Sequence, residues 1–179
     1  MKLNLFVLLV KKIFVQKKKI NRFKKQKELY TNDEVRQKEV KIRSYIKKEM
    51  LNIGELLTYQ ILINFFEKRD FKLIVCPQVL LRTFIEEVND DDNKLHAGLY
   101  VDFVIVNDNR LPVLVIEVDG KGHNTKNDEV KNTILSNAGV DLIRIDTSDW
   151  ERGKIKYKEF ILNKLEPKLQ NFVDNYNRT

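Results

Sequence analysis

The sequence is poor in the residues that build disulfide frameworks and zinc sites. It contains one cysteine, Cys76, among 179 residues, together with three prolines and six glycines. A single cysteine excludes an intrachain disulfide and any multi-cysteine zinc site, which favours a reducing compartment. We therefore expect a cytoplasmic protein with one compact domain and an appendage.

The chain also lacks a long uninterrupted apolar run. Its first ten residues, MKLNLFVLLV, are apolar, but Lys11 and Lys12 follow at once. A spanning helix needs roughly 20 apolar residues, and KKIFVQKKK offers no small-residue cleavage site for a secretory signal. An interfacial anchor, a segment packed on the domain and a stretch without structural role all stay open. Peripheral membrane contact through residues 1–20 is one expectation.

Positive charge is concentrated at the N-terminus. Residues 1–48 hold 16 Lys and Arg against four Asp and Glu, whereas residues 49–179 hold 17 against 22. Such an arm attracts a polyanion, either nucleic acid or an anionic lipid surface; a solvated tail is the plainer alternative. We divide the chain into a basic arm, 1–48, and a domain, 49–179. The candidates for nucleic-acid contact in the arm are Lys17, Lys18, Lys19, Arg22, Lys24 and Lys25.

Apolar periodicity predicts the first elements. Residues 29–49 have loose helical spacing, and residues 52–69 have strong helical spacing with Asn52 as a candidate cap. The segment 71–85, FKLIVCPQVLLRTFI, is rich in β-branched and aromatic residues and is predicted to be extended, with Pro77 at a bulge or an edge.

Two further strands are joined by a short connection. LYVDFVIV (99–106) and PVLVIEVD (112–119) predict an antiparallel hairpin whose paired residue numbers sum to about 219. This register places Asp102 opposite Glu117. Side chains in such a pair lie about 5 Å apart on the same face, so the two carboxylates are expected to be neighbours.

The last third completes the topology. It predicts a helix over 126–138 ended by Gly139, a strand over 140–146 and a helix over 153–165, with Pro167 ending or kinking its continuation. A helix between two strands is the usual crossover of a parallel pair. We therefore predict an α/β fold with a mixed sheet flanked by helices.

The octet IEVDGKGH (116–123) is unusually rich in ionisable groups. If the strand runs to residue 121, Glu117, Asp119 and Lys121 face the same side as Asp102. Carboxylates held so close repel each other, and burial adds to the cost. Two compensations stay open, a buried salt bridge with Lys121 or Arg144, or a divalent cation.

Taken together, these features resemble the PD-(D/E)XK nuclease superfamily, in the branch related to very-short-patch repair endonucleases, and specifically the DUF2726 group. The resemblance covers about residues 50–147 and rests on IGELLTYQ, PQV, VDFVIV, IEVDGKGH and NAGVDLIRID. It implies a restriction-endonuclease-like αβββαβ core with metal ligands at one end of the central hairpin. It also implies a metal-dependent endonuclease or exonuclease that uses Mg²⁺ or Mn²⁺.

The resemblance also assigns roles to residues. Asp102 matches the Asp of the motif and Glu117 the first acid of its E-x-K element, and both are expected to bind metal. Asp119 stands where the superfamily has lysine, so either it assists while Lys121 supplies the charge, or the frame is Asp119-x-Lys121. Glu55 is expected to complete the metal shell.

The remaining polar residues have several interpretations. His123 is a candidate proton donor to the leaving group or phosphate contact, or else a hydrogen-bonded turn residue. Lys131 and Arg144 are candidates for contact with the phosphate backbone. Asp128 is expected to start a helix by accepting from its exposed amides.

Three functions fit these observations. The first is a Mg²⁺-dependent nuclease acting on nucleic acid, with DNA ahead of RNA, and with a homodimer favoured if both strands of a duplex are cut. The second is a nucleic-acid-binding module of the same fold without turnover. The third is a membrane-tethered interaction protein that uses its basic arm.

Overall fold

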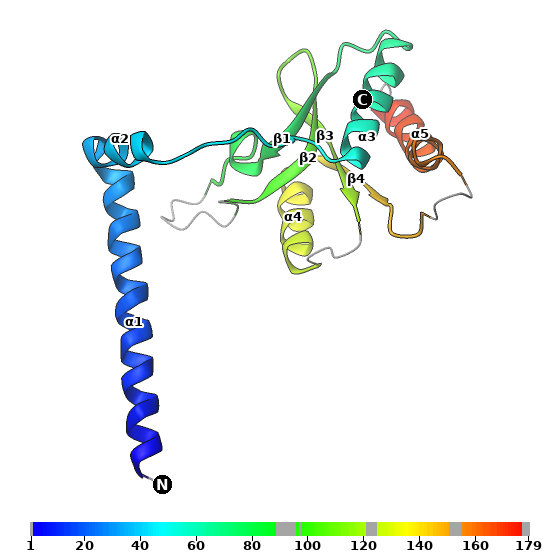
Figure 1. Ribbon diagram of the computed structural model, residues 1–179. Helices are drawn as coiled ribbons and strands as arrows, with labels where there is room; N and C mark the ends of the chain where they lie inside the picture. The colour runs from blue at the N-terminus through cyan, green and yellow to red at the C-terminus, as the bar shows by residue number, and fades with distance from the viewer. Residues whose placement is uncertain (1, 89–95, 97, 121–124, 151–154, 177–179) are drawn as a thin grey trace. The chain divides into compact units, whose positions relative to one another are not determined.

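The computed structural model describes residues 2–88, 96, 98–120, 125–150 and 155–176. Its internal contacts divide the chain into two compact units, Met1–Lys48 and Glu49–Thr179. The first unit contains helices α1 (Lys2–Thr31) and α2 (Asp33–Ile42) (Figure 1). Among the described residues, no helix combines the length and the apolar content needed to cross a membrane.

The helix expected over 29–49 is wrong in its bounds. The Asn32 side chain accepts hydrogen bonds from the N–H groups of Glu34 and Val35, so a new helix starts there. That helix ends at Ile42 and has no buried residue. Because a short helix depends on packing of an apolar face for most of its stability, nothing extends it to residue 49.

The second unit begins with α3 (Ile53–Glu67), and its predicted cap is confirmed. The Asn52 side chain accepts from the Glu55 N–H at 2.9 Å, and the Glu55 carboxylate accepts from the Asn52 N–H at 2.9 Å. This reciprocal capping box satisfies two amides that the helix leaves unpaired. It also fixes Glu55 in the first turn.

The sheet has four strands in the order β1-β2-β3-β4. Their bounds are β1 Ile74–Leu80, β2 Tyr100–Val106, β3 Pro112–Asp119 and β4 Asp141–Asp146. The short 3₁₀ helix η1 (Leu81–Thr83) follows β1. The pairs β1–β2 and β2–β3 are antiparallel, and β3–β4 is parallel across helix α4 (Thr125–Asn137). The predicted α/β fold with the αβββαβ order is therefore confirmed.

The predicted hairpin register is also confirmed. Phe103 pairs with Ile116, and Val104 pairs with Val115, before a shift near Val106. One further step along this register places Asp102 opposite Glu117. The two acids thus belong to the same face of the hairpin.

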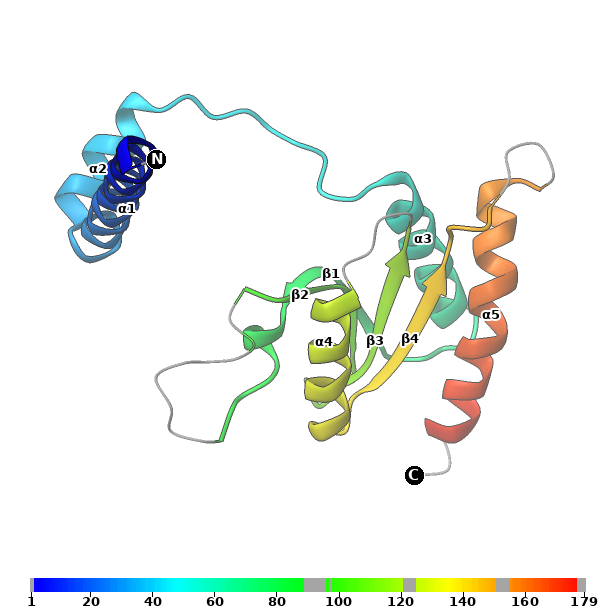
Figure 2. The same cartoon turned by 90° about the horizontal axis from the view of Figure 1, so that it is seen from below.

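Helices cover both faces of the sheet, with α4 on one and α3 and α5 (Tyr157–Tyr176) on the other (Figure 2). Phe103 and Ile116 pack with α3 and α5 in the larger apolar cluster, whereas Val104 and Val115 pack with Leu135 of α4. Because side chains alternate along a strand, Asp102 and Glu117 lie on the α4 face.

The sequence predicts that Pro167 ends or kinks the last helix. Helix α5 continues nine residues past Pro167, so the first of these alternatives is wrong. Leu165, Leu169 and Phe172 on both sides of it are buried. Burying such side chains contributes roughly 1.5–3 kcal/mol each, which offsets the cost of about 3 kcal/mol for an internal proline.

Candidate active site at the end of the central hairpin

Asp102 of β2 and Glu117 of β3 meet on the α4 face of the sheet. Asp102 is 7% exposed and Glu117 is 3% exposed. The Asp102 Oδ2 accepts a hydrogen bond from the Val118 N–H at 2.7 Å, and the Asp102 and Glu117 carboxyl groups lie close enough for each to affect the pKa of the other. The structure therefore brings together the two residues that the sequence placed opposite each other.

Burial raises the pKa of both carboxyl groups above their ordinary values. For Asp102, the hydrogen bond from Val118 and the charge of Lys131 partly oppose this rise, while the negative charge of Asp119 adds to it. For Glu117, Lys131 opposes the rise and the charge of Asp102 adds to it. Two desolvated acids that repel each other are stabilised in their charged forms by an added cation.

Lys131 of α4 supplies one positive charge. It is 8% exposed, and its ammonium donates to Glu117 Oε1 and lies 3.5 Å from Asp128 Oδ1. Asp128 and Lys131 are three residues apart on a helix, so their side chains share one face. The expectation that Lys131 contacts a phosphate backbone stays a prediction, since in this structure its ammonium faces carboxylates.

Arg144 of β4 holds the second acid of β3. Its guanidinium donates to both oxygens of Asp119, at 2.9 and 3.1 Å, and also to Asp128 at 3.3 Å and Asn132 at 3.0 Å. The sequence analysis names Lys121 or Arg144 as the salt-bridge partner of the Asp102–Glu117 pair, but Arg144 pairs with Asp119, and the described partner of Glu117 is Lys131. Arg144 is anchored within the protein, and its expected contact with phosphate is likewise untested.

Asp128 has a role that the sequence reasoning missed. It was expected to start α4 by accepting from backbone amides, but its carboxylate lies between Lys131 and Arg144. The signal was available in the sequence, because an acid three residues before a lysine on a helix is a stabilising pair. The sequence does not indicate that Asp128 also contacts Arg144 of β4, because the two residues lie on different elements.

Glu55 approaches the pair from α3. Burial is the main cause that raises its pKa, and the negative charge of Asp102 raises it further, while hydrogen bonds from the Asn52 backbone and the Gln78 side chain oppose the rise. Glu55 therefore senses Asp102 electrostatically, but its carboxylate also caps its own helix.

Gln78 was also missed. In the β1–β2 ladder Pro77 pairs with Phe103 and Val79 with Val101, so Gln78 stands opposite Asp102. Its φ of 52° lies in the left-handed region, which is costly for residues other than glycine. The sequence predicts Pro77 at a bulge or an edge. Strand β1 lies at the edge of the four-stranded sheet, and the backbone irregularity falls on the next residue.

The residues present fit a hard divalent cation. Mg²⁺ in proteins is commonly bound by one or two carboxylates together with water and substrate phosphates, and Asp102 and Glu117 provide such a pair. Asp102 takes part in no ion pair with any described residue. Within the described ranges, however, no three acidic, imidazole or thiol side chains are arranged to hold one ion.

Two predicted site residues cannot be placed. Strand β3 ends at Asp119, whereas the predicted patch required it to reach residue 121. Lys121 and His123 lie outside the described residues. Their expected roles stay predictions.

The basic residues of the arm belong to the first unit. All six candidates lie on α1 and are exposed, and Lys25 forms an ion pair with Glu39 of α2 at 3.1 Å. Their expected contact with nucleic acid is not tested by this geometry.

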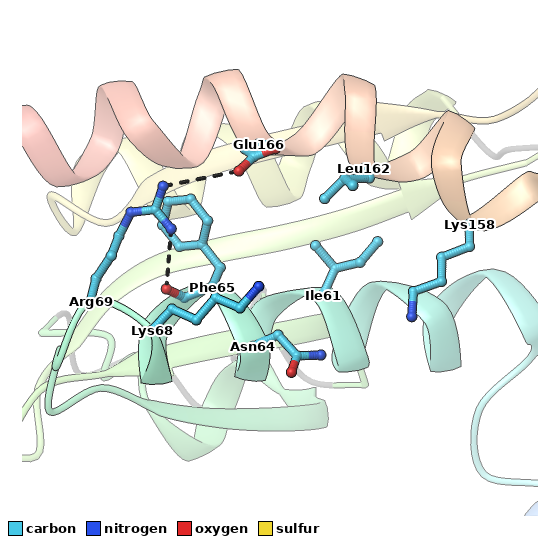
Figure 3. A pocket seen from close by; sticks show the side chains of 8 residues that line it. All are labelled: Ile61, Asn64, Phe65, Lys68, Arg69, Lys158, Leu162 and Glu166. Carbon is cyan, nitrogen blue, oxygen red and sulfur yellow. Dashed lines mark hydrogen bonds and ion pairs between the residues drawn. The ribbon is translucent and has the colours of Figure 1, made fainter.

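A groove of about 310 Å³ lies between α3 and α5 (Figure 3). Ile61, Phe65 and Leu162 form its apolar part, and Arg69 stacks over the Phe65 ring at 3.8 Å while approaching Glu166 at 4.0 Å. It is built on the later turns of α3, roughly 10 Å or more along the helix from Glu55 at a rise of about 1.5 Å per residue. It is separate from the carboxylate pair.

Comparison with known proteins identifies a family. The profile of a family described as "Protein of unknown function (DUF2726)" matches residues 47–164. The matched range contains the capping box, the hairpin with both buried acids, and all of α4. No curated protein and no solved structure matches the chain.

Proposed function

The chain belongs to the DUF2726 family, and from the geometry of its site we propose that it is a divalent-metal-dependent nuclease of the PD-(D/E)XK type. In this proposal it hydrolyses phosphodiester bonds of nucleic acid, with DNA ahead of RNA. One observation carries the proposal, the pairing of the buried acids Asp102 and Glu117 on neighbouring strands.

This pairing is costly for folding. Each carboxylate loses hydration on burial, and the two negative charges repel each other. Glu117 has the Lys131 ammonium as a partner, whereas Asp102 accepts a hydrogen bond from the Val118 N–H and forms no ion pair with any residue in the described part of the chain. Apolar residues at positions 102 and 117 would stabilise the fold more than Asp102 and Glu117 do. A cation-binding role explains why acids occupy these two positions.

In the proposed site, Asp102 and Glu117 would hold Mg²⁺ or Mn²⁺. Asp119 is engaged by Arg144 and Glu55 caps α3, so either would have to move to join the pair. Such an ion supplies Lewis-acid polarisation of a phosphoryl oxygen and lowers the pKa of a bound water. The protein's own groups fix the acids in place: Val118 orients Asp102 and Arg144 orients Asp119.

One observation favours a second candidate, a nucleic-acid-binding module without turnover. Asp119 stands at the position where the superfamily pattern has a lysine, and Arg144 neutralises it. In that case the described cations serve only to balance acids, and the basic arm provides affinity for nucleic acid.

Incubation of the full-length protein with plasmid, linear and single-stranded DNA and with RNA, with and without Mg²⁺ or Mn²⁺, tests the proposal. We expect cleavage that requires the metal. Asp102→Asn should reduce the rate at least about a hundredfold, because several kcal/mol of charge stabilisation are lost.

Asp108→Asn is the matched control, since it makes the same change at an exposed residue of the same hairpin. It should leave the rate unchanged. Absence of cleavage on every substrate would reject the nuclease, and tight binding without cleavage would support the second candidate.

A further inference from the structure

We propose that Lys131 of α4, and not Lys121, is the cation that acts beside the metal-binding carboxylates during phosphodiester hydrolysis. The inference rests on the proposed nuclease function and identifies a catalytic group that the sequence pattern placed elsewhere. Asp119 occupies the position two residues after Glu117, and Arg144 engages it. The positive charge next to Glu117 comes instead from the helix that covers the strand.

The position of Lys131 is unusual for a lysine. Lysine is almost never fully buried unless it is paired, and Lys131 is 8% exposed with its ammonium on Glu117 and 3.5 Å from Asp128. No other described lysine or arginine forms an ion pair with Glu117. Lys131 is therefore the described cation held at the acid pair.

Packing alone does not explain the charge. Leu135, one turn further along α4, is fully buried against Val115 and Val104. Lys131 continues this buried stripe of the helix, where a leucine or methionine would bury similar apolar area. Replacing a whole buried ion pair with apolar residues is often neutral or stabilising, so stability gives little reason for the Glu117–Lys131 pair as a unit, although Lys131 offsets the buried charge of Glu117.

Asp128 gives Lys131 a second anchor. Its Oδ1 lies 3.5 Å from the lysine ammonium and 3.3 Å from the Arg144 guanidinium. If the acid pair held a divalent ion, the ammonium would be displaced from Glu117 but would still have the Asp128 carboxylate beside it. The flexible four-carbon stem of lysine would permit this movement, and Lys131 would then be free to approach the phosphate of a substrate.

The chemical step balances without a further reactant. The oxygen of a water forms a bond to phosphorus, the bond from phosphorus to one ester oxygen breaks, and the proton released by the water is matched by one taken up by the leaving oxygen. Lys131 keeps its own proton throughout and stabilises the negative charge on the non-bridging oxygens.

The test compares Lys131→Met, Lys131→Arg and Lys121→Met in the full-length protein, with Lys72→Met as the matched control at an exposed lysine of the same unit. Methionine keeps the apolar stem without the charge. With Mg²⁺ and DNA, we expect Lys131→Met to lower kcat on the order of a hundredfold with KM nearly unchanged. Arginine should restore part of the rate, and the other two variants should keep it.

A second readout needs no nucleic acid and no turnover. Calorimetric titration with Ca²⁺ should show binding about tenfold tighter for Lys131→Met than for the wild type, because an ammonium no longer competes for Glu117. A Ca²⁺ affinity that is unchanged in Lys131→Met would show that the ammonium does not share Glu117 with a bound cation, and would overturn the inference.

The outcomes separate the two proposals. Cleavage by Lys131→Met at the wild-type rate, or loss of cleavage confined to Lys121→Met, overturns the role of Lys131 and leaves the nuclease standing. A wild type that cleaves none of the substrates overturns the nuclease and this inference with it.

Discussion

The Asp102 carboxylate on β2 accepts a hydrogen bond at 2.7 Å from the backbone N–H of Val118 on β3. Val118 directly follows Glu117, so this bond ties one acid to the backbone that carries the other. The separation of the two carboxyl groups is thereby set by the sheet rather than by free side-chain rotation. Preorganisation of this kind is what a cation site on rigid elements requires.

Divalent cations should stabilise the protein in the absence of nucleic acid. A ligand that binds only the folded state adds about 1.4 kcal/mol to the free energy of unfolding at ten times its Kd. We expect Mg²⁺ or Mn²⁺ to raise the melting temperature by a few degrees. Asp102→Asn should lose this increase and Asp108→Asn should retain it. An equal increase in both variants would place the ion elsewhere.

The acid pair should make stability fall as pH rises. Because burial raises the pKa of Asp102 and of Glu117, the folded protein binds more protons than the unfolded chain between the ordinary and the raised values. The free energy of unfolding therefore decreases across that interval, and the loss is complete above the raised pKa. Urea unfolding from pH 4 to 8, without divalent ions, measures this slope.

Asp102→Asn isolates one of the two acids in the same measurement. The asparagine oxygen can still accept from Val118, but it carries no charge. We expect the variant to be more stable than the wild type at pH 7 and to show a shallower decrease with pH. Identical slopes in the variant and the wild type would contradict the assignment.

The sequence was sufficient to predict the pairing of Asp102 with Glu117. Two strands with alternating apolar residues and a short connection can pair in few registers that bury the apolar face. A slip by one residue would turn the apolar side chains of one strand toward solvent. Local chemistry likewise located the cap at Asn52 and the helix end at Gly139, whose φ is 69°. These features depend on residues that are close in sequence.

The partner of Glu117 was not predictable in the same way. Lys131 follows it by 14 residues, and their contact depends on where α4 docks across the sheet. Arg144 meets Asp119 across a parallel pair whose register comes from that same docking. Residue spacing along β3 alone favours Lys121. The cation of the described site is Lys131, which comes from helix α4 on the face of the sheet.

The left-handed backbone of Gln78 should be measurable as strain. Glycine at φ 52° avoids a penalty of roughly 1–2 kcal/mol that any residue with a Cβ has. Gln78→Gly and Gln78→Ala both remove the side chain beyond Cβ, so the difference in stability between them reports mainly the backbone. We expect the glycine variant to be about 1 kcal/mol more stable than the alanine variant in urea unfolding.

Arg82, an exposed residue of η1 with ordinary backbone angles, provides the control for this comparison. There the alanine variant should be the more stable of the two, because glycine has more conformational freedom to lose on folding. If the alanine variant is the more stable of the two at both positions, the backbone of Gln78 is not strained.

The basic arm should bind a polyanion through its charges. We expect replacement of Lys17, Lys19 and Lys24 by glutamine to weaken duplex DNA binding and to reduce the slope of log affinity against log salt by about 0.9 per lysine that contacts a phosphate. Fluorescence anisotropy over a range of salt concentrations measures this slope. Replacing Lys68, Lys72 and Lys158, which are exposed on the other unit, gives a control with the same change in charge.

Lipid is the competing partner, because large apolar side chains are exposed among the arm's lysines. Phe23 is 71% exposed, and Val15 and Ile20 are each more than half exposed. Amphipathic segments bind anionic bilayers through buried apolar area together with about 1 kcal/mol per basic residue near the surface. Flotation with phosphatidylserine vesicles measures this binding. If Phe23→Ala weakens flotation while the salt slope of DNA binding is unchanged, the arm is assigned to a membrane surface. An unchanged flotation would leave nucleic acid as its partner.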